Sequence, residues 1–277
     1  MMPLKLMYIT NDPMVAEIAE NAGVDRVFVD MEYIGKAQRQ GGMDTVQSHH
    51  TVEDIKRLRQ VVSKSELLVR INPIHEASDK YTSSEEEIDS VIAAGADIVM
   101  LPFFKTPEEV KHFLRAVDGR AKTMALLETP EAAACVDDIL SIDGLDEIFV
   151  GLNDLSLGYG KKFMFEVLAD GTVEKLCCKF KQAGIPYGFG GVAMPGKGLL
   201  PAERIIREHY RLGSGCVILS RSFCNTAVVT DLAEIRRIFE SGISLIREEE
   251  KECERYLSYF DRNRIAVKEA VHQIIGG

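Results

Sequence analysis

Acidic side chains stand at the ends of two apolar runs in this sequence. Glu128 closes KTMALLE (122–128), and Asp154 follows EIFVGL (147–152), so the two carboxylates are 26 residues apart. A carboxylate at the end of a buried run is costly unless it has a partner. On neighbouring strands the two groups would supply oxygen ligands to Mg²⁺ or Mn²⁺ and leave positions for water and substrate. Either acid would equally suit a buried ion pair with an arginine, and spacing alone does not separate these two interpretations.

Arg70 is the cation that these acids could meet. It lies near the end of ELLVRI (66–71), and its planar guanidinium suits either a substrate carboxylate or an acidic side chain. Further polar residues close the apolar runs, namely Asp30, Glu32, Asn72, Asn153, Ser220 and Arg221.

Short apolar runs recur along the whole chain and predict the strands that must position these groups. They are nearly continuous rather than alternating, which is typical of parallel strands covered on both faces. The eight predicted strands are 4–9, 26–31, 66–71, 97–102, 122–128, 147–152, 185–190 and 216–220.

Amphipathic stretches with helix-start signals, such as Thr106-Pro107 and Thr129-Pro130, separate these runs. Eight strand–helix units in 277 residues predict a (β/α)8 TIM barrel. A doubly wound open sheet is the alternative, but no G-x-G-x-x-G follows the first strand. We expect a single domain over 1–277, with 226–277 a C-terminal helical extension that packs against the barrel or a partner subunit.

Composition narrows the class of partner. Hydrophobic residues make up 46% of the chain and charged residues 27%, with a net charge of −10 and no block of Lys or Arg. Nucleic acid and membranes are therefore not expected partners. No apolar run has the length of a signal peptide or a membrane span, and the six cysteines lack the C-x-x-C spacing of a zinc site. We expect a cytoplasmic protein.

Five motifs resemble the HpcH/HpaI aldolase and citrate lyase β-subunit family, within the phosphoenolpyruvate/pyruvate barrel superfamily. They occur in order over roughly residues 20–225. The motifs are FVDMEY (28–33), LLVRINP (67–73), ADIVMLPFFKTPEEV (96–110), ALLETPEA (125–132) and IFVGLNDLSLGYG (148–160).

The resemblance implies a function for these positions. Glu128 and Asp154 would ligate Mg²⁺ or Mn²⁺, and Arg70 would bind the carboxylate of a pyruvate-like 2-oxo acid. A metal chelated by such an acid acts as a Lewis acid on the developing enolate. The remaining residues that it places at the substrate are Glu32, Gly151, Leu152 and Asn153.

One departure leaves proton transfer unassigned. The aldolase branch has D-x-E-H after the second strand, and its histidine is the acid/base, whereas this chain has Tyr33 in that place. An unperturbed phenol is a poor base at neutral pH. Tyr33, His49, His50 and a water molecule remain as candidates.

The loop that carries these histidines, 32–50, has basic and amide side chains that would suit a phosphate or a second carboxylate. These are Lys36, Arg39 and Gln40.

The combined prediction is a metal-dependent carbon–carbon lyase of the class II aldolase type, acting on a 2-oxo acid and an aldehyde. The alternatives are a Claisen-type lyase of CoA thioesters, like the citrate lyase β-subunit, and a non-catalytic barrel that binds metal and oxo acid. The C-terminal extension leads us to expect a homo-oligomer.

Overall fold

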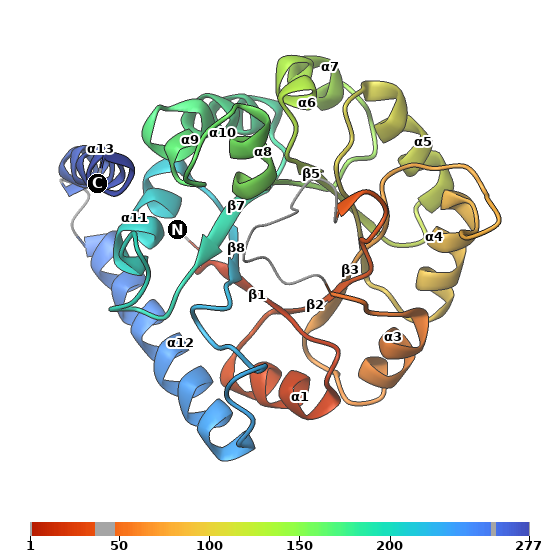
Figure 1. Ribbon diagram of the computed structural model, residues 1–277, viewed down its shortest axis with the longest axis horizontal. Helices are drawn as coiled ribbons and strands as arrows, with labels where there is room; N and C mark the ends of the chain where they lie inside the picture. The colour runs from red at the N-terminus through yellow and green to blue at the C-terminus, as the bar shows by residue number, and fades with distance from the viewer. Residues whose placement is uncertain (1, 37–47, 256–258, 277) are drawn as a thin grey trace.

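The computed structural model describes residues 2–36, 48–255 and 259–276. Eight parallel strands form a closed barrel in sequence order, with β8 paired to β1 (Figure 1). This confirms the predicted TIM barrel. The strands are β1 Lys5–Ile9, β2 Arg26–Asp30, β3 Glu66–Arg70, β4 Ile98–Leu101, β5 Lys122–Leu127, β6 Glu147–Val150, β7 Tyr187–Val192 and β8 Cys216–Leu219.

Helices surround the barrel, and several strands are followed by more than one. They are α1 Pro13–Ala22, α3 Val52–Arg59, α4 Ser84–Ala93, α5 Pro107–Val117, α6 Pro130–Ala134, α7 Val136–Leu140, α8 Leu152–Gly158, α9 Glu166–Ala169, α10 Thr172–Ala183, α11 Ala202–Leu212, α12 Leu232–Arg255 and α13 Phe260–Gly276.

Side-chain caps fix where several helices begin. Three helices start with reciprocal capping boxes, in which the N-cap hydroxyl and the N3 carboxylate each accept a backbone N–H. For α4 the N-cap residue is Ser83, and the helix begins at Ser84. The three boxes are Thr51/Asp54, Ser83/Glu86 and Thr106/Glu109.

The apolar core has two parts. Side chains that point inward from the strands fill the barrel, and those that point outward pack under the helices. This is why the strands read as continuous apolar runs rather than as alternating ones. The interior cluster comprises Met7, Phe28, Leu68, Ile98, Met100, Met124, Leu126, Phe149 and Cys216.

A buried arginine closes the N-terminal end of the barrel. Arg26 is 0% exposed and donates to Glu66 at 2.9 Å and to both carboxylate oxygens of Glu147 at 2.8 and 2.5 Å. Burial lowers the pKa of Arg26, but the two acids outweigh it and raise the pKa overall. This ion-pair network lies at the end of the barrel that carries stability rather than chemistry.

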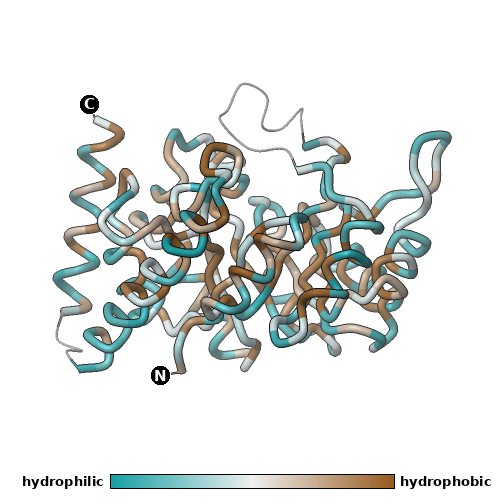
Figure 2. Tube along the Cα trace, turned by 90° about the horizontal axis from the view of Figure 1, so that it is seen from below, coloured by the Kyte–Doolittle hydropathy of each residue, from teal (hydrophilic) through white to brown (hydrophobic). Residues whose placement is uncertain are grey.

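The C-terminal extension packs against the protein's own barrel. The helix α12 contacts α1 and α11, and α13 contacts α11 and α9. Figure 2, a view from the side, shows the N-terminus at the bottom of the molecule and the C-terminus at the top, both toward the left. Among the described residues, no helix is long and apolar enough to span a membrane.

Candidate active site

Glu128 and Asp154 lie together at the C-terminal mouth of the barrel. Glu128 directly follows β5, and Asp154 is the third residue of α8, the helix that follows β6. Both are buried, and both line two adjoining cavities of about 410 and 200 Å³. The backbone N–H of Phe103 donates to Oε1 of Glu128 at 3.1 Å, which fixes the orientation of that carboxylate.

Gly151 makes room for this carboxylate. A Cβ at Gly151 would lie 2.6 Å from Oε2 and 2.8 Å from Cβ of Glu128, so no larger residue fits without moving the acid. Leu152 and Asn153 follow it, and both line the 200 Å³ cavity. The segment that the motif analysis placed at the substrate is therefore at the mouth of the barrel.

Arg70 faces the same cavity from β3. Its Nε and Nη2 donate to the two oxygens of Asp30, each at 2.8 Å, and its Nε lies 3.5 Å from Glu32. The guanidinium also lies over the ring of Phe28, 5.5 Å from the centroid. Burial lowers the pKa of Arg70, but Asp30 and Glu32 outweigh it and raise the pKa overall. The arginine at the barrel mouth is thus paired with acids of the β2 segment.

Lys36 joins this cluster from the loop after β2. Its Nζ donates to Oδ2 of Asp30 at 2.8 Å and lies 3.5 Å from Oε2 of Glu32. Two cations therefore neutralise two buried acids, so Lys36 is part of an internal network rather than of a solvated loop. Arg39 and Gln40, proposed with it, lie outside the described residues.

Tyr33 points away from the cavities at the barrel mouth. It is 40% exposed, its ring packs 5.6 Å from that of Tyr81, and it lines none of the cavities that contain Arg70 or Glu128. Burial and then the charge of Glu87 raise the pKa of Tyr33. The backbone N–H groups of Tyr33 and Ile34 donate to Oδ1 of Asn72, which fixes this turn.

The two adjacent histidines, His49 and His50, differ in exposure and in whether they line a cavity. His49 is exposed and lines none of these cavities. His50 is half-buried and lines a third cavity of about 900 Å³ together with Asp30, Lys36 and Arg70. Its Nδ1 accepts the backbone N–H of Asp30 at 3.0 Å. In that arrangement Nδ1 carries no proton, so the neutral ring holds its proton on Nε2.

The surroundings of His50 favour its neutral form. Burial lowers its pKa most; Asp30 and Asp54 raise it, and Lys36 and Arg70 lower it, with a net decrease. A neutral imidazole of this tautomer is a hydrogen-bond donor through Nε2–H rather than a proton acceptor. The site therefore has a fixed N–H donor where the sequence suggested a base.

The donor set suits a hard divalent cation. Two buried carboxylates share one cavity, and oxygen ligands of this kind are those that Mg²⁺ and Mn²⁺ prefer. Among the residues that the structure describes, no group of three or more His, Cys, Asp or Glu converges. Glu128 and Asp154 would thus supply part of a coordination sphere, and water and substrate the rest.

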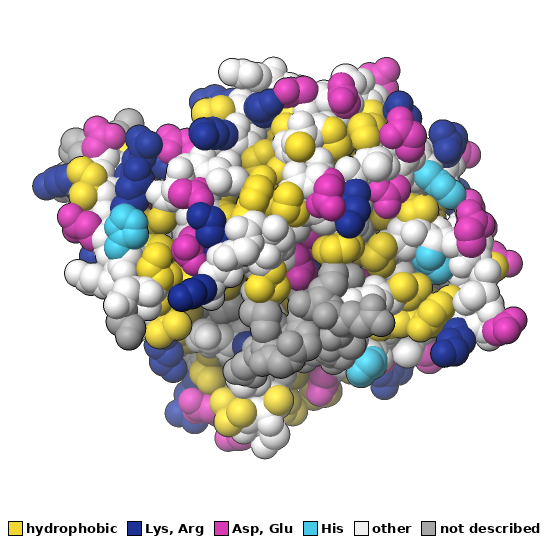
Figure 3. Space-filling view, turned by 45° about the horizontal axis from the view of Figure 1, so that its top comes forward, with side chains coloured by type: hydrophobic (Ala, Val, Ile, Leu, Met, Phe, Trp, Pro, Cys, Tyr) yellow, Lys and Arg dark blue, Asp and Glu magenta, His cyan; other side chains and the backbone are white. Residues whose placement is uncertain are grey.

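The 200 Å³ cavity at this mouth has a partly apolar lining. Figure 3 shows hydrophobic and charged side chains interspersed on this side of the molecule, around the residues drawn in grey. Apolar residues from the strand ends also line the 200 Å³ cavity, which would exclude water from a reacting group.

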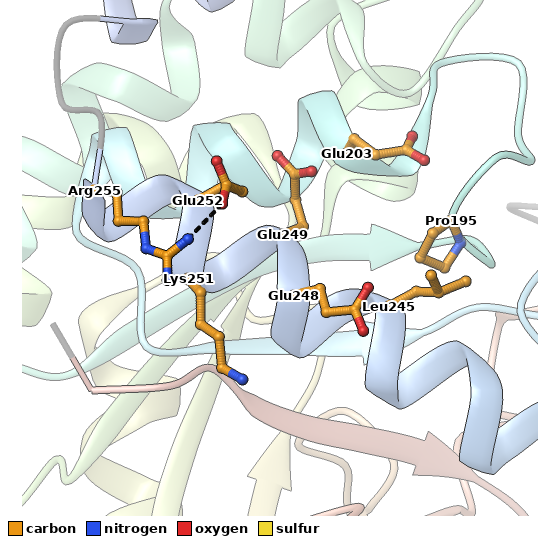
Figure 4. A pocket seen from close by; sticks show the side chains of 8 residues that line it. All are labelled: Pro195, Glu203, Leu245, Glu248, Glu249, Lys251, Glu252 and Arg255. Carbon is orange, nitrogen blue, oxygen red and sulfur yellow. Dashed lines mark hydrogen bonds and ion pairs between the residues drawn. The ribbon is translucent and has the colours of Figure 1, made fainter.

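A separate hollow lies outside the barrel, between α12 and the segment before α11 (Figure 4). Half of its lining residues are acidic, but Glu249 pairs with Arg207 at 2.5 Å and Glu252 with Arg255 at 3.1 Å. It shares no lining residue with the cavities that contain Glu128, Asp154 or Arg70, so we do not count it as part of the active site.

Comparison with known proteins assigns the chain to a family. The sequence profile described as HpcH/HpaI aldolase/citrate lyase matches residues 5–188. The protein belongs to the HpcH/HpaI aldolase/citrate lyase family. Among curated relatives, a hydroxypyruvate/pyruvate aldolase of Rhizorhabdus wittichii is 36% identical over 77 residues, which are 25% of this chain and 31% of that protein. The similarity thus spans under a third of that relative's length.

Solved structures share the fold of this chain. A family member from Burkholderia cenocepacia superposes with a TM-score of 0.62 at 18% identity, covering 84% of this chain and 95% of that one. A citrate synthase, SbnG, superposes with a TM-score of 0.61 at 17% identity over 85% and 94% of the two chains. At such identities the likeness establishes the barrel alone.

Proposed function

We propose that this protein is a divalent-metal-dependent carbon–carbon lyase that acts on a 2-oxo acid, an aldolase of the HpcH/HpaI type. The observation that carries the proposal is the buried pair Glu128 and Asp154, which lines one cavity with Arg70. Family membership and the aldolase relatives support the same reaction class.

Each residue has a role in this proposal. Glu128 and Asp154 hold Mg²⁺ or Mn²⁺, which would act as a Lewis acid on the keto oxygen of the substrate. Arg70 orients the substrate carboxylate. Its Nη1 has no hydrogen-bond partner among the described residues, while Nε and Nη2 are held by Asp30. The acid thus keeps the guanidinium in place with one edge available to a carboxylate.

His50 acts as a fixed hydrogen-bond donor. Its Nε2–H would stabilise negative charge that develops on a substrate oxygen, as donors of an oxyanion hole do. Because Nδ1 is occupied by Asp30 and Tyr33 points away, we assign proton transfer to a water molecule.

The test is a panel of reactions with the intact protein. Pyruvate release from several 4-hydroxy-2-oxo acids should require Mg²⁺ or Mn²⁺ and should be lost in a chelator. Turnover across the panel that is unchanged by the chelator would contradict metal dependence. Acetyl-CoA-dependent turnover without any pyruvate release would favour the Claisen-type lyase instead.

We also propose that the protein assembles as a homo-oligomer. Light scattering should give at least twice the 30.8 kDa mass of one chain, whereas a monomer at working concentrations would contradict this.

A further inference from the structure

The residue that donates to Glu128 has an uncommon backbone conformation. Phe103 is the second residue after β4, and its φ is 49°. Among the residues that the structure describes, Phe103 and Asp118 are the non-glycine residues with positive φ. This left-handed region crowds the Cβ of a bulky residue, and it favours glycine or asparagine. Asp118 is the exposed C-cap of α5, where the conformation is common, whereas Phe103 ends no helix.

Two hydrogen bonds join the turn at Phe103 to the segment after β5. The backbone N–H of Phe103 donates to Oε1 of Glu128 at 3.1 Å, and the hydroxyl of Thr129 donates to the backbone carbonyl of Phe104 at 2.8 Å. The first bond runs from the β4 turn to the β5 segment, and the second runs back. Each bond therefore helps to hold the other in place. We call these four residues, Phe103, Phe104, Glu128 and Thr129, the β4–β5 clamp.

Thr129 anchors the clamp to the start of α6. Its side chain is buried, and Oγ1 also accepts the backbone N–H of Ala132 at 3.1 Å as the N-cap of that helix. A hydroxyl has a single proton to donate, so these two contacts fix its orientation. The carbonyl of Phe104 thus meets a donor that is itself held by a helix. This anchor explains how a strained turn can persist beside the carboxylate.

The clamp decides how the carboxylate of Glu128 faces the two adjoining cavities. Oε1 is held by Phe103, which lines the cavity of about 410 Å³. Oε2 lies against Gly151, which lines the cavity of about 200 Å³ together with Arg70 and Asp154. Contacts that orient a metal-ligating side chain typically change metal affinity about 10- to 100-fold. A backbone donor at this position is therefore expected to affect metal binding.

We propose that the left-handed backbone at Phe103, anchored by Thr129, positions Glu128 for metal binding. The inference rests on the proposed function, in which Glu128 is a metal ligand. The conformation lets the N–H of Phe103 meet Oε1 of Glu128 while the carbonyl of Phe104 meets Thr129. Phe103 and Thr129 act through Glu128, so they are positioning residues rather than ligands.

Three variants of Phe103 separate its backbone from its ring. Phe103→Asn and Phe103→Val both remove the ring, but asparagine tolerates the left-handed conformation and a β-branched valine does not. Calorimetry with Mn²⁺ on the intact, chelator-treated protein should give wild-type affinity within about threefold for Phe103→Asn and at least roughly tenfold weaker binding for Phe103→Val. Phe103→Gly should also bind Mn²⁺ normally, which excludes the new amide as a ligand.

Asp118 provides the matched control for backbone strain. Its φ of 50° is almost that of Phe103, but it lines none of the cavities at the barrel mouth. Asp118→Val should lower the free energy of unfolding in urea, because it places valine in the same unfavourable conformation. Both Asp118→Asn and Asp118→Val should bind Mn²⁺ with wild-type affinity. The comparison separates a loss of stability from a loss of metal binding.

The anchor is tested in the same way at Thr129. Thr129→Val keeps the shape of the side chain and removes the hydroxyl, so Mn²⁺ affinity should fall roughly tenfold. Thr129→Ser keeps the hydroxyl and should bind Mn²⁺ within about threefold of wild type. Recovery of affinity in the serine variant would assign the effect to the hydrogen bond with Phe104 rather than to packing.

The outcomes separate the clamp from the metal site. Equal Mn²⁺ affinity in Phe103→Asn and Phe103→Val, or normal binding in Thr129→Val, would overturn the clamp while leaving the metal site in place. Failure of the wild type itself to bind Mn²⁺ would reject the proposed metal site and this inference with it.

Discussion

The backbone N–H of Asp30 donates to Nδ1 of His50 at 3.0 Å, while the side chain of Asp30 holds Arg70 and Lys36. One residue at the end of β2 therefore orients the histidine, the arginine and the lysine of the barrel mouth. The tautomer of His50 follows from this contact, and so does its expected role as a donor.

Two substitutions of His50 distinguish a hydrogen-bond donor from a base. His50→Gln places an amide N–H near the position of Nε2 and should retain activity within about tenfold. His50→Asn places no donor there and should lower kcat roughly 100-fold or more, the usual cost of a lost oxyanion donor. Steady-state kinetics on pyruvate release measures both, with His49→Asn as the unchanged control. Equal inactivity of the two His50 variants would show that the ring transfers protons.

The pH dependence of turnover should report the neutral form of His50. Its pKa is lowered, chiefly by burial, so the acid limb of kcat should lie below the ordinary value of about 6.5. Lys36 contributes to that decrease, so Lys36→Met should move the limb to higher pH. His50→Gln should lack this limb altogether. A limb that is identical in wild type and His50→Gln would assign it to another group.

A methyl group at Gly151 should disturb Glu128 selectively. The added Cβ would lie 2.6 Å from Oε2 of Glu128, so Gly151→Ala should weaken Mn²⁺ binding at least roughly tenfold in calorimetry. The control Gly215→Ala places its Cβ no nearer than 3.8 Å to the backbone of Tyr187 and should bind Mn²⁺ normally. Unchanged Mn²⁺ affinity in Gly151→Ala would place the metal elsewhere.

A buried histidine behind β7 should make the fold sensitive to acid. His209 stacks on Phe189 with ring centroids 3.8 Å apart, and burial lowers its pKa to about 3. The unfolded chain binds this proton below about pH 6.5 and the folded chain does not, so stability falls as the pH drops from about 6.5 toward 3. Between pH 6.5 and 5 this one group should cost about 2 kcal/mol.

Urea denaturation at pH 7 and pH 5 measures that loss. The variant His209→Gln should be less stable than wild type at pH 7 but should lose less on acidification. The same loss in both proteins would mean that His209 does not contribute to the acid sensitivity.

The barrel could be predicted from the sequence because its strands are buried on both faces. Each of the eight apolar runs became a strand, with ends displaced by no more than two residues. The position of Glu128 and Asp154 at the barrel mouth could be predicted for the same reason, since a carboxylate at or just after the end of a buried run stands out. Both signals, the apolar run and the acid at its end, lie within a few consecutive residues and can be recognised without the fold.

Pairings across the barrel could not be predicted in the same way. Arg26 begins a strand and reads as a boundary charge, yet it lies inside the barrel against Glu66 and Glu147. The choice between Tyr33 and His50 depends on the turn that Asn72 fixes from the next strand. Contacts of this kind exist only once distant segments have met, so residue type and spacing do not reveal them.

The most direct test of the proposed metal site is metal reconstitution of the wild type and of Glu128→Gln, with pyruvate release as the readout. Chelator-treated wild type should be inactive and should recover with Mg²⁺ or Mn²⁺. Glu128→Gln should stay folded by circular dichroism and should not recover at the same metal concentration, because it lacks one of the two carboxylates of the site. Full activity of chelated wild type, or normal reconstitution of Glu128→Gln, would contradict the metal site proposed at Glu128 and Asp154.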